Sequence, residues 1–422
     1  MSIYKDLRDT LLSYEKDEIS YKVALEELKQ KVGERDTALA HRYFKGVIER
    51  RSTLEGVLDT FSNMPLSKYN EAHLLYMLIG IYGLLFMRQA DYAIINDLVE
   101  NVKNEMKGLA PMTNGILRNV ARKKHSIHID EDVVDMHQDL LKALKKDFKD
   151  EEIKAYMKKI SEPARLEILS MIDPKELQTL LADEGFRTHL SEIVEYGLWV
   201  EKSAGLFETN AFKEGLFYVQ SFSSQLASSL IKQTSGGRVL DIAASPGGKS
   251  IAMQRYAPEN SYWLNDVNKE KLVPIKENLQ RLCLSVEGLS LWDATKHQYR
   301  WSNAFDVVFL DAPCSGSGIL ARNVEIKTRR DALELDVAFN TQRRILHETS
   351  RYVKKNGFLI YCSCSILRRE NQEQIEHFLK THKGFSRVEI QGKFVEQGYL
   401  VTNPMHHDMD GFFAAILKRE SL

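Results

Sequence analysis

Apolar residues in the first 130 positions recur every three to four residues, which is the spacing of one face of an α-helix. The clearest series are Leu39-Tyr43-Val47, Ile94-Leu98-Val102 and Ile116-Leu117-Val120. Almost no strand pattern accompanies them, so we predict an all-α bundle over residues 1–130. The longest apolar run, residues 74–87, is shorter than the roughly 20 residues that cross a bilayer. We therefore expect a buried helix there and no membrane partner.

Residues 131–205 show a different pattern. They begin in an acidic stretch and continue as a charged amphipathic helix, with Lys, Asp and Glu dense between residues 142 and 159. A solvated helix face has this composition. We predict a small connector domain over this range.

Residues 206–422 alternate between short apolar strands and helical segments. The strands are predicted at 239–242, 262–264, 289–291, 305–310, 358–360 and 412–417. The segment 305–310 is apolar apart from Asp306, as expected for a strand buried on both faces. This alternation predicts an α/β domain with a doubly wound parallel sheet. We assign the catalytic role to this third domain.

Two of the four cysteines stand just beyond the carboxyl ends of predicted strands. Cys314 follows the strand at 305–310, and Cys364 follows the strand at 358–360. Ligands bind at that edge of an open parallel sheet, and neighbouring strands lie ~5 Å apart, so both thiols could face one substrate. No signal-peptide pattern is found, so we expect a cytoplasmic protein in which cysteines are catalytic or structural.

The net charge is −1, so any affinity for nucleic acid has to come from local basic patches. Two basic strips stand out: Arg118, Arg122, Lys123 and Lys124, and then Arg322, Lys327, Arg329 and Arg330. Such patches bind phosphate without reading sequence. A solvated helix face explains the first strip equally well, whereas the second follows Cys314 and is better placed for a nucleic-acid contact.

A loop of small residues connects the first predicted strand to its helix. It reads Asp241-Ile242-Ala243-Ala244-Ser245-Pro246-Gly247-Gly248-Lys249-Ser250. Its glycines let the backbone approach a ligand, and the helix start offers free N–H groups. The dinucleotide fingerprint G-x-G-x-x-G is absent, and Ala243 stands where a P-loop needs its first glycine. A nucleotide triphosphatase is therefore the weaker alternative.

An aspartate follows each of three later strands: Asp266, Asp293 and Asp311. A carboxylate after the second strand holds a ribose diol in this fold class. Asp293 could accept a hydrogen bond from an exocyclic amine, and Asp311 could pair with a cationic amino group. A ribose, an adenine and an amino group together describe S-adenosylmethionine. A turn or N-cap role is the alternative for each aspartate taken singly.

A pair of thiols suits methylation at carbon 5 of a pyrimidine, which is a poor nucleophile. A thiolate that adds to carbon 6 makes carbon 5 nucleophilic, and a base must afterwards remove the proton from carbon 5. These considerations do not decide which cysteine attacks. Lys249 is a candidate for the positive charge that activates a thiol. Cys362 and Cys364 could form half of a zinc site, but no second pair follows, so we predict no metal.

Several segments resemble the RNA cytosine-C5 methyltransferase family. DIAASPGGKS is similar to its cofactor loop, and DAPCSGSG and YCSCSILRRENQEQI are similar to its two cysteine motifs. FKEGLFYVQSFSSQLAS and DGFFAAILKR resemble its flanking elements, while ALAHRYFKGVIERR, INDLVE and TNGILRNV resemble the NusB-like domain of a ribosomal subgroup. The resemblance covers nearly the whole chain. It implies a Rossmann-like class I methyltransferase sheet, a NusB-like RNA-binding domain and small-subunit ribosomal RNA as the partner.

The resemblance also implies roles for single residues. Cys364 matches the nucleophile and Cys314 the cysteine that assists product release. The residues that match cofactor-binding positions are Ala243, Ala244, Ser245, Pro246, Gly247, Gly248, Lys249, Asp266, Asp293 and Asp311. Lys249 and Asp311 also match positions of the catalytic site, where Asp311 borders the target base.

The sequence departs from the family pattern at a few positions. The substitutions are Ala243 for Cys, Ser245 for Ala, Ser250 and Ser363 for Thr, and Ser221 for an acidic residue. None removes a catalytic group. Two alternatives stay open: methylation of transfer RNA by the same chemistry, and a non-catalytic RNA-binding or ribosome-assembly factor. We expect the protein to act as a monomer.

Overall fold

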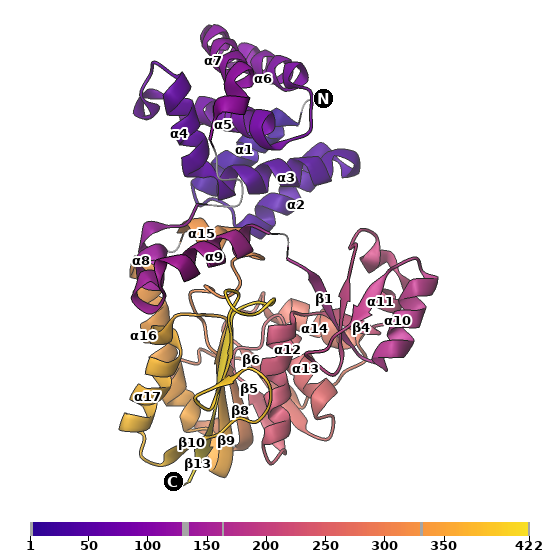
Figure 1. The fold of residues 1–422 in the computed structure, drawn as a ribbon. Helices are drawn as coiled ribbons and strands as arrows, with labels where there is room; N and C mark the ends of the chain where they lie inside the picture. Colours follow the sequence, from indigo (N-terminus) through magenta and orange to yellow (C-terminus); the bar gives the residue numbers. More distant parts are fainter. Residues whose placement is uncertain (1–2, 129–134, 163, 330–331, 421–422) are drawn as a thin grey trace. The chain divides into compact units, whose positions relative to one another are not determined.

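The computed structural model describes residues 3–128, 135–162, 164–329 and 332–420. They fall into two compact units, Met1–His137 with Asn323–Arg329, and Gln138–Arg322 with Arg330–Leu422 (Figure 1). The two units are considered separately below.

The first unit is a helical bundle, as the apolar spacing predicts. Its helices are α1 (Tyr4–Glu15), α2 (Tyr21–Val32), α3 (Glu34–Glu49), α4 (Arg51–Phe61), α5 (Glu71–Phe86), α6 (Asp91–Glu105) and α7 (Ala110–Lys123). Helix α5 carries the long apolar run and is buried on nearly every side, so the prediction of a buried helix is confirmed. Within the described residues, no helix has the length and apolar character needed to cross a membrane.

The short helix α15 (Val324–Arg329) belongs to the first unit, although it follows Cys314 in the sequence. Lys327 is fully buried there, and its ammonium group contacts Glu49 Oε1 at 2.6 Å. Burial lowers the pKa of Lys327, and the charge of Glu49 only partly opposes this effect. The hypothesis of an RNA-binding strip is therefore wrong for Lys327. The side chain of Arg329 and all of Arg330 lie outside the described residues.

The second unit begins with α8 (Gln138–Asp147) and α9 (Asp150–Ser161), the charged helices that the sequence predicts. A small antiparallel sheet follows, with strand order β2-β3-β1-β4. Its strands and helices are β1 (Leu166–Ser170), α10 (Pro174–Asp183), β2 (Thr188–Leu190), β3 (Gly197–Val200), α11 (Asn210–Lys213) and β4 (Phe217–Val219). Ile168, Leu177 and Phe217 belong to their common core. The hydrophobic pattern did not predict this sheet.

A nine-stranded sheet forms the centre of the second unit, in the order β11-β12-β13-β9-β8-β5-β6-β7 with β10 paired to β13. The strands are β5 (Arg238–Asp241), β6 (Ser261–Asp266), β7 (Gly288–Leu291), β8 (Phe305–Asp311), β9 (Val353–Ser363), β10 (Phe385–Val388), β11 (Val395–Glu396), β12 (Tyr399–Thr402) and β13 (Phe412–Arg419). Strands β5 to β9 pair in parallel, and β13 pairs antiparallel to β9. The predicted doubly wound α/β sheet is confirmed.

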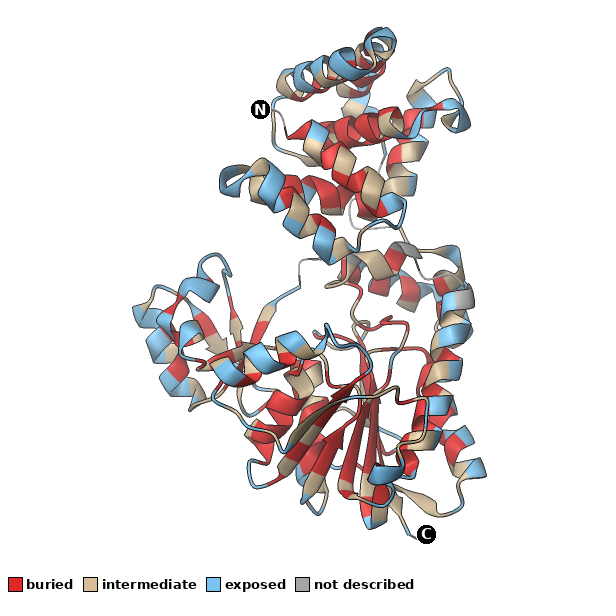
Figure 2. Cartoon of the chain, turned by 180° about the vertical axis from the view of Figure 1, so that it is seen from behind, coloured by how far each residue is buried: buried red, intermediate tan, exposed pale blue. Residues whose placement is uncertain are grey.

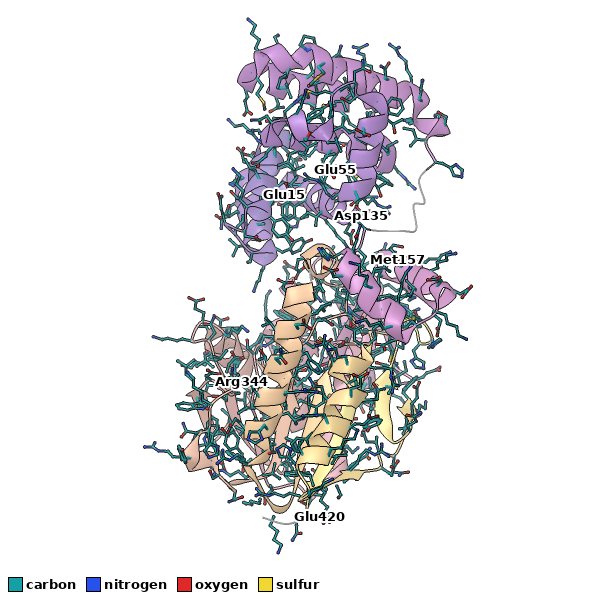
Figure 3. The ribbon with its side chains drawn as sticks, turned by 90° about the vertical axis from the view of Figure 1, so that its left-hand side faces the viewer. Glu15, Glu55, Asp135, Met157, Arg344 and Glu420 are labelled. Carbon is teal, nitrogen blue, oxygen red and sulfur yellow. The ribbon has the colours of Figure 1, made fainter. Side chains whose placement is uncertain are left out.

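Helices pack on both faces of this sheet, so its central strands are buried (Figure 2). α12 (Phe222–Ser229), α13 (Gly248–Tyr256) and α14 (Leu272–Arg281) share one core with Val307 and Phe309 of β8. α16 (Ala332–Ser350) and α17 (Gln372–Thr381) share the other core with Val308 and Leu310. Figure 3 shows α16, marked by Arg344, in front of the sheet. Alternate residues of one strand thus face opposite helical layers.

Candidate active site

The two cysteine segments lie side by side at the carboxyl edge of the sheet. β8 and β9 are parallel neighbours, with Asp311 opposite Cys362 in the register. Beyond the strands, Ala312 N donates to Cys362 O at 2.8 Å and Gly318 N donates to Cys364 O at 2.9 Å. Cys314 Sγ and Cys364 Sγ are hydrogen-bonded at 3.2 Å, and both side chains are half-buried. The expectation that two thiols meet at this edge is confirmed.

The environment of Cys314 keeps its thiol protonated. The hydrogen bond to Cys364 raises the pKa of Cys314 well above its ordinary value, and burial and the charge of Glu370 add to this effect. Cys314 therefore keeps its proton at neutral pH.

Lys249 supplies a positive charge beside the sulfurs. Its Nζ donates to Asp311 Oδ2 in an ion pair, and the two side chains are 18% and 25% exposed. Burial alone would lower the pKa of Lys249, but the charge of Asp311, with smaller contributions from Cys362 and Cys364, outweighs it and raises that pKa. Lys249 is therefore charged at neutral pH, and Asp311 holds it toward the end of β8.

Cys362 is not part of the reactive pair. Its side chain is fully buried, and its Sγ donates to Asp311 Oδ1 at 3.6 Å. Burial and the charge of Asp311 raise its pKa well above the ordinary value, so it remains a neutral thiol. This environment gives Cys362 a packing role in the core of the sheet.

The small-residue loop runs from the end of β5 to the start of α13. Gly247 has a φ of 101°, a conformation that L side chains rarely adopt. A Cβ added at Gly248 would lie 3.0 Å from Tyr218 Cε1. Ala244 N donates to Asn265 O at 2.9 Å, and Ser245 N donates to Asp266 Oδ2 at 3.1 Å. The loop is thus bent tightly against β6, with the N-terminus of α13 behind it.

The strand-end aspartates differ in their surroundings. Asp266 is buried at the end of β6, and its carboxylate also accepts from Asn268 N at 3.2 Å. Asp293 follows β7, and its Oδ1 accepts from Thr295 N at 3.0 Å and Thr295 Oγ1 at 2.7 Å. These bonds from Thr295 are the leading cause of a lowered pKa of Asp293. Asp293 Oδ1 thus makes the hydrogen bonds of a turn, one of the two roles that the sequence left open, while Asp266 and Asp311 lie on either side of β5 in the strand order.

Several described cations of the basic strips are paired with carboxylates. Arg322 Nη2 lies 3.0 Å from Glu167 Oε2, and its Nε lies 2.7 Å from Asp410 Oδ2. In the first strip, Arg118, Arg122 and Lys123 are exposed, whereas Lys124 pairs with Asp91. The exposed cations of α7 therefore fit a phosphate contact better than Arg322 does.

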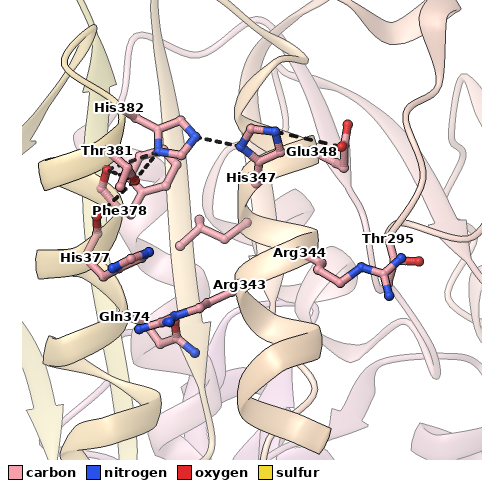
Figure 4. A pocket seen from close by; sticks show the side chains of 11 residues that line it. Thr295, Arg343, Arg344, His347, Glu348, Gln374, His377, Phe378, Thr381 and His382 are labelled. Carbon is pink, nitrogen blue, oxygen red and sulfur yellow. Dashed lines mark hydrogen bonds and ion pairs between the residues drawn. The ribbon is translucent and has the colours of Figure 1, made fainter.

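A cavity of about 550 Å³ lies between α16 and α17 (Figure 4). His347 Nδ1 and His382 Nε2 are hydrogen-bonded at 2.8 Å on its wall. Its lining, within the described chain, contains none of the site residues predicted above. Gln374 also lines it and is almost fully buried. Sequence reasoning gave this glutamine no role, although its motif was recognised.

Comparisons with known proteins identify the family to which the chain belongs. Residues 228–418 match the family model described as 16S rRNA methyltransferase RsmB/F, and residues 5–122 match the NusB family. Ribosomal RNA small subunit methyltransferase B of Vibrio cholerae is 29% identical over 407 residues, covering 94% of this chain and 93% of that protein. The protein of the same name from Citrobacter koseri is 30% identical over 367 residues, covering 84% of each chain.

The crystal structure of PH0851 has a similar fold, with a TM-score of 0.80 at 21% identity over 99% of both chains. The family is assigned from sequence similarity, because single relatives match this chain over both its NusB-like part and its methyltransferase part. The chain belongs to the RsmB/F family of 16S rRNA methyltransferases, which are S-adenosylmethionine-dependent enzymes.

Proposed function

We propose that this protein methylates carbon 5 of a cytosine in 16S ribosomal RNA, through a covalent bond between Cys364 and carbon 6 of the base. The observation that carries the proposal is the 3.2 Å contact between the Cys314 and Cys364 sulfurs. Methylation of an exocyclic nitrogen has no use for a thiol pair, whereas a C5 reaction needs both a nucleophile and a base. The target base has to leave its stack to reach the sulfurs.

The residues around the loop fit S-adenosylmethionine. Asp266 would hold the ribose hydroxyls, and the backbone of residues 243–248 would lie against the cofactor because Gly247 and Gly248 leave room for it. Asp293 would face the adenine amine, and Asp311 the amino group. When bound, S-adenosylmethionine supplies an electrophilic methyl group, and the methyl–sulfur bond breaks with its electron pair staying on sulfur.

Cys364 starts the reaction as a thiolate. Its sulfur forms a bond to carbon 6, and the electron pair of the C5–C6 double bond becomes the new bond between carbon 5 and the methyl carbon. Lys249 places a positive charge near Cys364 and so favours the ionised sulfur before attack. Asp311 fixes this ammonium group through their ion pair.

Cys314 ends the reaction. Its hydrogen bond to Cys364 is the leading cause of its raised pKa, followed by burial and the charges of Cys364, Glu370 and Asp311. Once the Cys364 sulfur is bonded to carbon, it carries no negative charge, so its share of this effect is reduced while the other causes remain. Cys314 then loses its proton to solvent and removes the proton from carbon 5. The double bond re-forms, the bond from carbon 6 to Cys364 breaks, and Cys364 leaves as a thiolate hydrogen-bonded to the Cys314 thiol. One proton is released per methyl group transferred.

A set of cysteine-to-alanine variants tests this function, each assayed on a 16S rRNA transcript labelled with tritium at carbon 5 of cytosine. Wild-type protein with S-adenosylmethionine should release tritium in proportion to methyl incorporation. Cys314→Ala should trap an adduct that survives denaturing electrophoresis, and Cys364→Ala should form none. Cys283→Ala, which changes an exposed cysteine, is the matched control and should behave as the wild type.

The same assay separates the alternatives. Methyl incorporation without tritium release would contradict carbon 5 as the acceptor. Activity on transfer RNA but not on the ribosomal transcript would favour transfer-RNA methylation. RNA binding without methylation of either RNA would favour an assembly factor.

A further inference from the structure

Two consecutive residues, Glu370 and Asn371, lie between the cysteine segments. Glu370 ends the 3-10 turn Arg368–Glu370, and Asn371 directly precedes α17. Both are buried polar residues, with 2% of Glu370 and 4% of Asn371 exposed. Tyr361 Oη donates to the carbonyl of Glu370 at 2.6 Å and so ties this turn to β9. Burying a polar side chain is costly unless it is hydrogen-bonded, so their partners are informative.

Glu370 holds the segment that carries Cys314. Its Oε1 accepts from Ser315 N at 2.8 Å, and its Oε2 accepts from Ser315 Oγ at 2.6 Å. Gln342 Nε2 donates both to Glu370 Oε1 at 3.2 Å and to Pro313 O at 2.9 Å. The residues before and after Cys314 are thus fixed by one buried network. Gln374 Nε2 donates to Gln342 Oε1 at 2.9 Å and extends this network to the cavity of Figure 4.

Asn371 holds the segment that carries Cys364. Its Oδ1 accepts from Ser363 Oγ at 2.6 Å, and its Nδ2 donates to Ser365 O at 2.7 Å. The two neighbours of Cys364 are therefore attached to one amide group. The two segments also meet directly, because Ser317 Oγ and Ser365 Oγ lie 2.9 Å apart.

We propose that Glu370 and Asn371 are positioning residues that divide the reaction between them, with Glu370 governing the release step through Cys314 and Asn371 governing the attack step through Cys364. This inference rests on the proposed function. A carboxylate suits Glu370 because it accepts only, and its three neighbours here are donors. An amide suits Asn371 because one partner is a hydroxyl donor and the other a carbonyl acceptor. Misplacing a reacting group by about 1 Å can cost 10²-fold in rate.

The test compares Glu370→Gln and Asn371→Ala, each alone and combined with Cys314→Ala, on the labelled 16S rRNA transcript. Adduct formation and product release are measured separately by rapid quench. Glu370→Gln should form the adduct at the wild-type rate but release product about 10²-fold more slowly. In the Cys314→Ala background, Glu370→Gln should change neither the rate of adduct formation nor the rate of product release any further. Asn371→Ala should instead slow adduct formation about 10²-fold, in both backgrounds.

The controls separate positioning from a general folding defect. Glu376→Gln changes an exposed glutamate on α17, the helix that follows these two residues, and should leave both steps unchanged. Gln342→Met removes the amide that bonds both Glu370 and Pro313 and must slow release selectively, so the test stands even if Glu370→Gln unfolds. Equal slowing of both steps by either Glu370→Gln or Gln342→Met would overturn the inference. Failure of Cys314→Ala to trap an adduct would instead overturn the proposed function.

Discussion

Replacing Lys249 with methionine tests how far the electrostatics of the site depend on one positive charge. The Lys249–Asp311 pair is 18% and 25% exposed, so water screens it only in part. A hydrogen bond to a charged group contributes roughly 1.5–3 kcal/mol to stability, and partial exposure puts this pair in the lower half of that range. We expect Lys249→Met to lower the free energy of unfolding by about 2 kcal/mol. Methionine has a similar length, so the loss reflects the charge more than the packing.

Thermal unfolding of the single and double variants measures this coupling. Lys249→Met should lower the Tm by about 4–8 °C. Asp311→Asn should also destabilise the protein, because it leaves the ammonium group without its partner. The double variant should lose about 1–2 kcal/mol less than the sum of the two single losses. Losses that simply add would refute the pairing between Lys249 and Asp311.

The same variant has a kinetic consequence. Without Lys249, the Asp311 charge beside the sulfurs is no longer compensated, which disfavours a thiolate at Cys364. Adduct formation at pH 7 should slow by about 10- to 100-fold, which corresponds to about 1.4–2.8 kcal/mol. Rapid-quench measurement with the Cys314→Ala protein isolates this step. An unchanged rate of adduct formation would show that Lys249 does not activate the nucleophile.

Three further predictions concern Asp241, Cys362 and Cys314. Burial raises the pKa of Asp241 to about 7, so the stability that the protonated side chain contributes is full below about pH 4 and is lost as the pH rises through 7. In urea titrations, Asp241→Asn should therefore gain stability relative to wild type as the pH rises across that window. A difference in unfolding free energy that stays constant with pH would contradict the pKa shift. Cys362→Ala should cost about 1 kcal/mol in stability and leave the rates of adduct formation and product release within threefold of wild type. Loss of adduct formation would instead give Cys362 a chemical role. Because Cys314 must lose its proton before release, single-turnover release should accelerate from pH 6 to 8; a flat profile would exclude Cys314 as the base.

The sheet and the sulfur pair could be predicted from sequence because their signals are local. An apolar run such as 305–310 defines a strand, and a cysteine a few residues later lies at its carboxyl edge whatever the surroundings. Parallel neighbours then bring Cys314 and Cys364 together. The small sheet formed by β1 to β4 was not predicted, because its strands are 3–5 residues long and leave little periodic pattern.

Residues whose roles depend on distant partners could not be predicted in this way. Lys327 looks like an RNA-binding cation in sequence, but Glu49, 278 positions away, pairs with it in the interior. Glu370 lies in a recognisable motif, yet its contacts with Ser315 span 55 positions. Asp293 has the strand-end position of a cofactor ligand, but Thr295 also explains it as a turn residue. Burial and long-range hydrogen bonds decide such cases.

Mass spectrometry of the adduct trapped by Cys314→Ala tests the assignment of the nucleophile most directly. After protease and nuclease digestion, the peptide that contains Cys364 should carry a cytidine with one added methyl group. The same peptide also contains Cys362. Fragmentation of the peptide must therefore locate the bond on Cys364. A methylated cytidine on Cys362, or on no cysteine at all, would contradict covalent attack by Cys364.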